Sequence, residues 1–349
     1  MIRLAQLYTG NVGSEIVRRC AGHPHLELVA VMVHSDDKAG TDSGTLVDAE
    51  PNGVVTTQSF DEVIAARPDA AIHSGMLWDV ELITALLRAG VNVYTGIGGF
   101  YLPASPEFDI IDEAGRAGNA SFTAGGNIPG LISDVFPLFL TGYTGRIRQI
   151  RARQANDVST YPSGPQIQSL GIGKDPAADP EIAEMIDVGF VAGIRQSANM
   201  VADGLGVKCT DCVLAAKRVV LAEEDIVLPS SGLLVAAGTV AGIEWTWAAT
   251  AADREFLRVT NQQTAALGLG PGWRDRSDDP SWTVEIDGEP PIIATFGWPA
   301  GFQTGESTFL LNVSRAMNTI PRLVAASAGY VSVLDFPAVA AGDGLARVG

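Results

Sequence analysis

The sequence predicts an α/β fold in which a doubly wound parallel sheet is followed by a second α+β domain built on an antiparallel sheet. Short apolar runs alternate with helical segments in the first part of the chain, and a glycine-containing turn joins the first run to the first helix. After Gly145 polar and apolar residues alternate, which is typical of a sheet with one solvated face. We therefore expect one domain over residues 1–145, to which a C-terminal helix over 305–337 returns, and a second domain over residues 146–304.

The alternation begins with Ile2–Tyr8, a run with little charge, as in a buried parallel strand, followed by Asn11–Cys20, whose apolar residues have helical spacing. Strands that alternate with short helices form βαβ units, whose right-handed crossovers place ligands at the carboxyl ends of the strands. The further expected strands are Leu26–Val33, Asp69–His73, Val91–Thr95 and Ala120–Thr123, and the further helices are Phe60–Arg67, Asp79–Ala89 and Pro106–Ala117.

The second domain is expected to be a meander of strands with one long helix. Helical spacing covers Pro180–Leu205, and a last helix over Ser307–Ala325 has its apolar residues on one stripe. The expected strands are Arg146–Gln154, Val213–Leu221, Leu233–Ile243, Trp245–Ala249, Phe256–Asn261, Trp282–Ile286 and Ile292–Phe296.

Charge excludes some classes of partner. The chain has 349 residues with 46% hydrophobic and 18% charged residues, and its formal net charge is -17. Phosphate backbones and anionic membrane surfaces repel such a protein, so we expect neither a nucleic acid nor a membrane as partner. The one basic cluster carries no interleaved aromatic residues, and we interpret it as the solvated face of a strand; its members are Arg146, Arg148, Arg151 and Arg153.

No targeting or metal signal stands out. The N-terminus lacks a basic region followed by a long apolar run, and the longest apolar stretch, Gly232–Ile243, is too short to cross a membrane. Cys209 and Cys212 form a C-x-x-C without a second ligand pair, so we expect incidental cysteines and no metal site. These observations favour a cytoplasmic protein.

The first strand-to-helix turn matches the dinucleotide fingerprint G-x-G-x-x-G of the Rossmann fold, except that Tyr8 stands at the first glycine. Gly10 lets the backbone approach a pyrophosphate, and Gly13 lets the helix pack close to the strand. The amides of Asn11, Val12 and Gly13 open the helix and face the anion. This turn therefore predicts a nicotinamide dinucleotide cofactor.

The end of the second strand bears on the choice between NAD and NADP. An acid there bonds the ribose 2′-hydroxyl, whereas a cation accepts a 2′-phosphate. The terminal residue is His34; Ser35 and Lys38 are able to bind a phosphate, and Asp36 and Asp37 oppose it. We expect NADP, with NAD as the alternative.

Other strand ends supply further cofactor residues. Small residues stand at the ends of the strands Asp69–His73 and Val91–Thr95, where a nicotinamide ribose is expected to lie against the backbone. Asn127 follows the last strand, where its amide can bond the carboxamide or the substrate. The expected contacts are Ser74, Gly75, Thr95, Gly96 and Asn127. Ordinary strand-exit turns remain the alternative for these loops.

Short motifs are spread over the whole chain in a fixed order. They are Thr9–Gly13, Gly126–Gly130 with Asp134, Gly171–Gly173, Gly189–Gly193 with Ser197, Ala202–Gly206, Ala237–Gly242, Asn318–Pro321, Gly329 and Asp335–Pro337. No single motif is specific, but their order and spacing are. Together they resemble one known family, the dihydrodipicolinate reductase-like oxidoreductases of the 2,4-diaminopentanoate dehydrogenase and native amine dehydrogenase type.

The resemblance implies hydride transfer between a nicotinamide and a C–N carbon, and a homodimer. It also implies a glutamate that handles ammonia, but the corresponding stretch, Thr95–Pro103, has no carboxylate, and the family's histidine appears as Phe190. Amination needs a base to accept a proton, whereas hydride transfer needs only the cofactor, orientation and charge stabilisation. The absence of this carboxylate is therefore compatible with a reductase acting on a C=O, C=N or conjugated C=C bond.

We expect an NAD(P)H-dependent oxidoreductase acting on an apolar small molecule, with Tyr101 and Asn127 as catalytic candidates. The first alternative is an amine dehydrogenase with an atypical active site. The second, from another class, is a non-catalytic sensor that binds a nicotinamide nucleotide. The substrate pocket is expected to be apolar and to be lined by Trp78, Ile97, Phe100, Tyr161, Phe190, Trp245 and Trp298.

Overall fold

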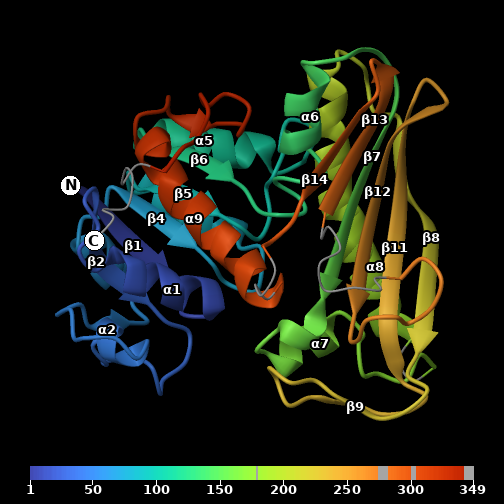
Figure 1. The fold of residues 1–349 in the computed structure, drawn as a ribbon. Helices are drawn as coiled ribbons and strands as arrows, with labels where there is room; N and C mark the ends of the chain where they lie inside the picture. Colours follow the sequence, from blue (N-terminus) through green and yellow to red (C-terminus); the bar gives the residue numbers. More distant parts are fainter. Residues whose placement is uncertain (178–179, 274–281, 300–303, 342–349) are drawn as a thin grey trace. The chain divides into compact units, whose positions relative to one another are not determined.

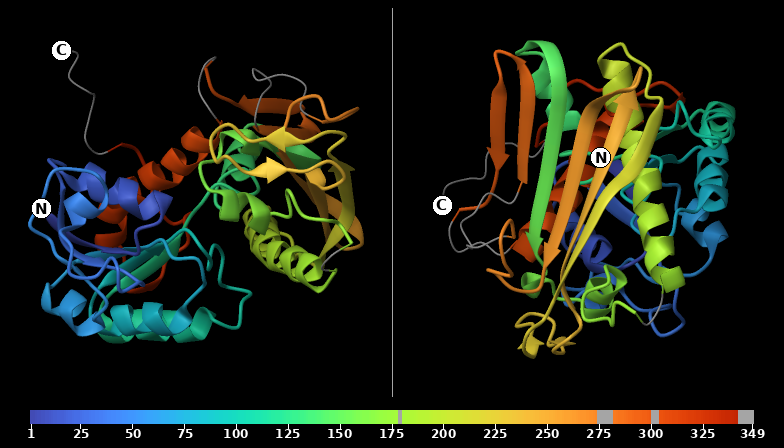
Figure 2. Two further views of the ribbon diagram at one scale, coloured as in Figure 1. Left: turned by 90° about the horizontal axis from the view of Figure 1, so that it is seen from below. Right: turned by 90° about the vertical axis from the view of Figure 1, so that its right-hand side faces the viewer.

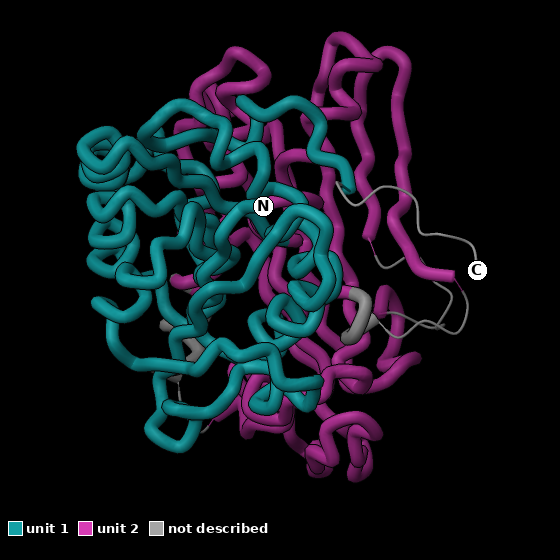
Figure 3. Tube along the Cα trace, turned by 90° about the vertical axis from the view of Figure 1, so that its left-hand side faces the viewer, with its two compact units in different colours: residues 1–126, 309–349 teal, residues 127–308 magenta. Residues whose placement is uncertain are grey.

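The computed structural model describes residues 1–177, 180–273, 282–299 and 304–341 (Figure 1). Residue contacts divide the chain into two compact units, residues 1–126 with 309–349 and residues 127–308 (Figure 3). The chain thus leaves the first unit after Gly126 and returns to it at Phe309. The roles predicted from the sequence, cofactor binding in one domain and substrate binding and dimerisation in the other, stay predictions.

The first unit contains a seven-stranded sheet in the order β15-β6-β5-β4-β1-β2-β3, in which every neighbouring pair is parallel. This confirms the doubly wound parallel sheet. The two-residue strands β3 and β15 are too short for hydrophobic periodicity to predict them. The strands are β1 Ile2–Leu7, β2 Leu26–Met32, β3 Thr56–Thr57, β4 Ala70–His73, β5 Asn92–Thr95, β6 Ser121–Ala124 and β15 Gly329–Tyr330.

Successive residues of the strands face opposite sides of the sheet, so two separate cores form. Leu4 packs on one side with apolar residues of α1 and α9, whereas Ala5 and Leu7 pack on the other with those of α3, α4 and α5. The left view of Figure 2 shows blue α1 and orange α9 on one side of the sheet and teal α5 on the other. These helices, with the short α2, are α1 Asn11–Cys20, α2 Ser43–Leu46, α3 Phe60–Ala65, α4 Val80–Arg88, α5 Phe108–Gly118 and α9 Thr304–Val324.

The returning segment over 305–337 is helical only in its first part, where the helix expected over Ser307–Ala325 is found as α9. Helix α9 ends at Val324, and Gly329 then pairs with Ser121 as the start of β15. Gly329 has φ 109, a left-handed conformation that glycine tolerates and a helix excludes. A Cβ at Gly329 would also overlap with the carboxylate of Asp112, so the turn into β15 requires glycine.

The second unit contains a six-stranded sheet in the order β14-β13-β7-β12-β11-β8. Its pairs are antiparallel except β7 with β12, which are parallel, so the sheet is mixed and not purely antiparallel as expected. A separate pair is formed by β9 Ile226–Val227 and β10 Leu234–Val235. The sheet strands are β7 Gly145–Asp157, β8 Asp211–Leu221, β11 Val240–Ala251, β12 Arg254–Thr264, β13 Trp282–Glu289 and β14 Ile292–Phe296.

The strand expected over Leu233–Ile243 is interrupted, because a turn at Ala236–Thr239 with Gly238 at φ 82 separates β10 from β11. Beyond that turn the single strand β11 covers both the end of the strand expected over Leu233–Ile243 and the strand expected over Trp245–Ala249.

The helices of this unit are α6 Val135–Thr141, the 3-10 helix η1 Val158–Thr160, α7 Gly164–Ser169 and α8 Pro180–Gly204. No helix among the described residues is long and apolar enough to cross a membrane.

A fully buried carboxylate, Asp134, organises the entry into α6. Its oxygens accept hydrogen bonds from the backbone N–H of Gly130 at 2.9 Å, the backbone N–H of Val135 at 2.6 Å and the hydroxyl of Ser197 on α8 at 2.7 Å. Burial raises the pKa of Asp134, and these hydrogen bonds oppose that rise. One side chain thus joins the loop before α6, the start of α6 and α8.

Replacing Asp134 with alanine is expected to destabilise the second unit by about 3 kcal/mol, because several buried donors lose their acceptor at once. Urea denaturation followed by tryptophan fluorescence measures this unit, since all of the six tryptophans except Trp78 lie within residues 127–308. Glu113→Ala, an exposed change on α5, is the control. A loss in Asp134→Ala no larger than in the control would contradict the role of this carboxylate.

Candidate functional site

The first turn of α1 presents free amide donors at the carboxyl end of β1. Gly10 is the N-cap residue, with φ -76 and ψ -169, and no side chain caps the helix there. The first N–H groups of a helix have no partner within the helix and carry the positive end of its dipole. This arrangement fits the phosphate groups of a dinucleotide, which bind helix N-termini of this kind.

The two glycines of this turn differ in their surroundings. A Cβ at Gly13 would overlap with the carbonyl oxygen of Tyr8 and lie 2.7 Å from Nε2 of Gln6, so the close approach of α1 to β1 requires glycine. A Cβ at Gly10 would meet no atom within 4 Å. Open space at Gly10 and close packing at Gly13 are the conditions that the dinucleotide fingerprint demands.

Tyr8 replaces the fingerprint's first glycine, yet its backbone has the left-handed conformation that glycine would adopt there, with φ 71. Gln6 holds it: Nε2 donates to the carbonyls of Leu7 and Tyr8, each at 2.9 Å, and lies 2.7 Å from the hydroxyl of Ser74. Burial, with a further contribution from Asp79, raises the pKa of Tyr8. The signal for Gln6 in the sequence is a polar residue inside an apolar strand.

The loop after β2 reaches the same turn. The ammonium Nζ of Lys38 lies 3.5 Å from the carbonyl oxygen of Thr9, beside Gly10. His34 is exposed, and Gln58 donates to its carbonyl at 2.7 Å. A hydrogen bond from Ser35 lowers the pKa of Asp37. The structure thus brings the expected residue Lys38 to the cofactor turn, whereas Ser35 is engaged by Asp37.

The expected residues at the ends of β4 and β5 lie side by side. The ring Nδ1 of His73 is 3.1 Å from the hydroxyl of Thr95, which also accepts from the backbone N–H of Ile97 at 3.2 Å. Burial lowers the pKa of His73, and Asp79 opposes that change. Ser74 is joined to Gln6 as above, and a Cβ at Gly75 would lie 2.9 Å from the ring of Tyr8. The predicted loops therefore meet at one edge of the sheet.

Two expected pocket residues of the first unit belong to its core. Trp78 packs over the segment after β5: added Cβ atoms at Gly98 and Gly99 would lie 2.8 Å and 2.6 Å from its ring. Phe100 is buried in the same cluster. These contacts explain both side chains as packing, so their assignment to a substrate pocket gains no support here. Ile97 is half-buried and Tyr101 is buried beside this segment.

The other candidates lie within the second unit. Asn127 is buried and its amide nitrogen donates to the carbonyl of Thr308 at 2.7 Å, so one of its donors serves the chain itself. Tyr161 is buried, and burial raises the pKa of its hydroxyl. Trp298 packs edge-on against Trp282 and Phe296.

Phe190 and Trp245 form an aromatic cluster between α8 and β11. Their ring centroids are 5.0 Å apart, and the ring of Trp247 lies 5.9 Å from Phe190 and is stacked on Trp245 at 6.4 Å. Asp187, which sequence reasoning missed, accepts from the indole Nε1 of Trp245 at 2.7 Å and forms an ion pair with Lys217 at 2.8 Å. An acid within the apolar stretch Met185–Val191 was the available signal. Trp245 is 0% exposed, so its contacts are those of a core residue.

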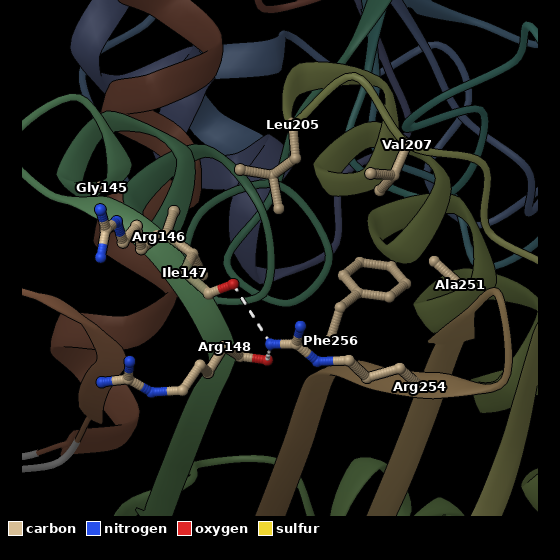
Figure 4. A pocket seen from close by; sticks show the side chains of 9 residues that line it. All are labelled: Gly145, Arg146, Ile147, Arg148, Leu205, Val207, Ala251, Arg254 and Phe256. Atoms are coloured by element: carbon tan, nitrogen blue, oxygen red, sulfur yellow. Dashed lines mark hydrogen bonds between the residues drawn. The ribbon is translucent and has the colours of Figure 1, made fainter.

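A hollow of about 310 Å³ in the second unit lies at the start of β7, and none of the predicted site residues lines it (Figure 4). The guanidinium of Arg254 donates to the carbonyls of Ile147 and Arg148. Arg148 is paired with Asp287 and Glu289 of β13, and Arg151 with Glu285. These arginines of the basic cluster therefore form ion pairs with carboxylates of the neighbouring strand, which agrees with the interpretation of a solvated strand face.

No cluster of ligating side chains is found among the residues that the structure describes. Burial raises the pKa of Cys212 to about 12 and also raises that of Cys209. A thiol must lose its proton to act as nucleophile or metal ligand, so these environments oppose both roles.

Matches to known proteins agree with this geometry. The family model described as dihydrodipicolinate reductase, N-terminus, matches residues 8–103, and the model of the 2,4-diaminopentanoate dehydrogenase C-terminal domain matches residues 131–347. The chain is 29% identical over 343 residues to an amine dehydrogenase of Streptomyces virginiae, covering 94% of both chains.

Solved structures show the same fold. An amine dehydrogenase from Mycobacterium smegmatis aligns with a TM-score of 0.78 at 21% identity over 98% of both chains. A probable dehydrogenase from Thermotoga maritima aligns with a TM-score of 0.55 at 13% identity, over 96% of this chain and 92% of that one. The family model that covers residues 131–347 spans more than half of the sequence. The chain is therefore an NAD(P)-dependent oxidoreductase that belongs to the dihydrodipicolinate reductase-like family of 2,4-diaminopentanoate dehydrogenases.

Proposed function

We propose that the chain is an NADP-dependent reductase that transfers a hydride to a C=O, C=N or conjugated C=C bond of an apolar small molecule. The observation that carries the cofactor assignment is the turn between β1 and α1, with open space at Gly10 and close packing at Gly13. The observation that favours reduction over amination is the segment from Thr95 to Pro103, which lacks a carboxylate and is filled by glycines packed under Trp78.

Residues of the first unit are proposed to bind the cofactor, with Asn127, the first residue of the second unit, as a further contact. The backbone amides of Asn11, Val12 and Gly13 would bind the pyrophosphate, with Gly10 leaving room for it. Ser74, Gly75, Thr95 and Gly96 would contact the nicotinamide half, and Asn127, which keeps one N–H for such a bond, would meet the carboxamide or substrate. When bound, the nicotinamide supplies or accepts the hydride, while the protein orients the substrate and handles the proton.

Lys38 supports NADP as the preferred cofactor. Lys38 follows β2, and its ammonium lies beside the carbonyl of Thr9 in the turn between β1 and α1. The adenosine ribose of a dinucleotide binds near the end of the second strand of such a fold. The engagement of Ser35 by Asp37 leaves Lys38, with His34, to carry the 2′-phosphate. NAD is the alternative, since Asp36 and Asp37 repel a further negative charge.

Tyr101 is the proposed proton donor to the oxygen or nitrogen that develops charge as hydride arrives. It belongs to the segment Thr95–Pro103 after β5, and its phenol carries a proton that it is able to donate. We also propose that apolar residues of either unit make the substrate's surroundings apolar: Trp78, Ile97 and Phe100 of the first unit, and Tyr161, Phe190, Trp245 and Trp298 of the second. The homodimer implied by the family resemblance also remains a proposal.

A second candidate function is amine dehydrogenation with an atypical active site, and the similarity to the Streptomyces virginiae protein favours it. Such a reaction needs an acid or base near the substrate nitrogen. The half-buried pair of Asp187 and Lys217 beside Trp245 supplies titratable groups of the required kind. Cofactor binding without turnover, as in a sensor, is the third possibility.

Replacing Lys38 with alanine is expected to weaken NADPH binding about tenfold and to leave NADH binding unchanged, because only NADPH carries the 2′-phosphate. Isothermal titration calorimetry measures both affinities, with Lys208→Ala as the control at an exposed lysine of the second unit. Equal effects on the two cofactors, or tighter binding of NADH by the unchanged protein, would refute the preference for NADP.

Replacing Tyr101 with phenylalanine is expected to lower kcat about a hundredfold with little change in the KM for NADPH, because the ring stays and only the proton donor is lost. The rate of NADPH oxidation measures this. Tyr143→Phe removes a hydroxyl from a 66% exposed tyrosine and serves as the matched control. If Tyr101→Phe keeps the wild-type kcat, another group donates the proton.

A panel of apolar ketones, imines and enones distinguishes the candidate functions. The proposed reductase is expected to oxidise NADPH with at least one of them in the absence of ammonia, and added ammonia should not accelerate it. Turnover that requires ammonia, together with NADP-dependent oxidation of amines at alkaline pH, would establish the second candidate. NADPH binding with no turnover on the panel would point to a sensor.

A further inference from the structure

Tyr8 has an unusual backbone for its residue type. Its φ of 71 lies in the left-handed region, which bulky L side chains rarely adopt and glycine adopts freely. The surrounding hydrogen bonds impose this conformation. The backbone N–H of Tyr8 donates to the carbonyl of Met32 at 2.7 Å, and the side-chain amide of Gln6 donates to the carbonyl of Tyr8 at 2.9 Å. Glycine would serve this backbone without strain, so the ring of Tyr8 is retained against a conformational cost.

The ring extends from the end of β1 toward the end of β4. Its centroid is 5.7 Å from that of His73, with the rings at 75° in an edge-to-face arrangement. It also occupies the space above Gly75, where a Cβ would lie 2.9 Å from ring atom Cδ2. Tyr8 is only half-buried among the described residues, so part of the side chain remains accessible at this edge of the sheet.

Strands β1 and β4 are the neighbours at which the strand order reverses. In sequence order β2 and β3 follow β1 on one side of the sheet, while β4, β5 and β6 continue on the other. Doubly wound folds bind their ligands in the crevice outside the carboxyl ends of the strands at this switch point. The ring of Tyr8 thus spans the place where a dinucleotide crosses from its adenosine half to its nicotinamide half.

We propose that Tyr8 is a cofactor-binding residue whose ring contacts the nicotinamide–ribose half of the dinucleotide, an inference that rests on the proposed function. Contact with this half, and not with the adenosine half, follows from direction. The ring lies toward His73, at the end of β4, and Gly75, just after it, whereas the residues proposed for the adenosine ribose, such as Lys38, follow β2. The ring replaces a fingerprint glycine with a surface that the ligand can touch.

The test compares two probes on Tyr8→Gly, which restores the fingerprint glycine and removes the ring. Calorimetry is expected to show NADPH binding weakened about tenfold, while binding of 2′,5′-ADP, which has only the adenosine half, is unchanged. Tyr8→Phe keeps the ring and is expected to bind both probes as the unchanged protein does. If the unchanged protein prefers NADH, then NADH and ADP replace the two probes.

Thermal unfolding followed by circular dichroism checks that the variants fold. Glycine suits the left-handed backbone, so Tyr8→Gly is expected to fold; Tyr8→Asn, whose residue type also tolerates this region, is the second variant. Wild-type affinity for NADPH in either folded variant overturns the inference, as does an equal loss for both probes. Failure of the unchanged protein to bind any nicotinamide dinucleotide overturns the cofactor assignment itself, and this inference with it.

Discussion

The first turn of α1 can approach the end of β1 only because position 13 has no side chain. A Cβ there would meet the Tyr8 carbonyl, the Gln6 amide and the Ser74 hydroxyl together, so this one contact joins β1, α1 and the end of β4. The donors of the helix terminus, the left-handed residue beside them and the loops that line the sheet's edge all depend on that spacing. A larger residue at position 13 would push α1 away from the ends of β1 and β4, although it would leave every hydrogen-bonding group of these elements in place.

The segment after β5 is organised by packing and not by charge. Where the family resemblance implies a carboxylate, Gly98 and Gly99 lie against the ring of Trp78, which in turn packs on Phe122. A glutamate grafted at Gly98 would have to displace that indole. In place of the acid, this part of the core is packed by a tryptophan and two glycines of complementary size.

Periodicity alone predicted the parallel sheet, because its strands are continuous apolar runs and its helices have clear stripes. Asn11–Cys20 and Ile292–Phe296 coincide with the observed elements. The two-residue strands were not predicted, because two residues are too few to show a periodic pattern. The strand expected over Leu233–Ile243 was wrong, because the sequence alone does not show that Gly238 adopts the positive φ of a turn. The parallel pairing of β7 with β12 depends on chain routing, which alternation cannot encode.

The candidate site was only partly predictable for a similar reason. The glycine turn and Lys38 could be found because spacing and strand order place them at one edge of the sheet. Gln6, Asp187 and Lys217 act through contacts between segments far apart in sequence, such as the bond from Trp245 to Asp187. Aromatic residues were ambiguous, since composition does not distinguish a core tryptophan from one that faces a ligand.

The discontinuity of the first unit has a consequence for the order in which the chain can fold during synthesis. Val313, Ala316, Met317, Ile320 and Leu323 of α9 complete the core beside Leu4, Ile16 and Ile72, and β15 covers the outer edge of β6. A ribosome delivers these segments after the whole of the second unit. Until then one apolar face and one strand edge of the nascent first unit lack their covering. The second unit contains its own sheet and can form first, although the first unit begins the chain.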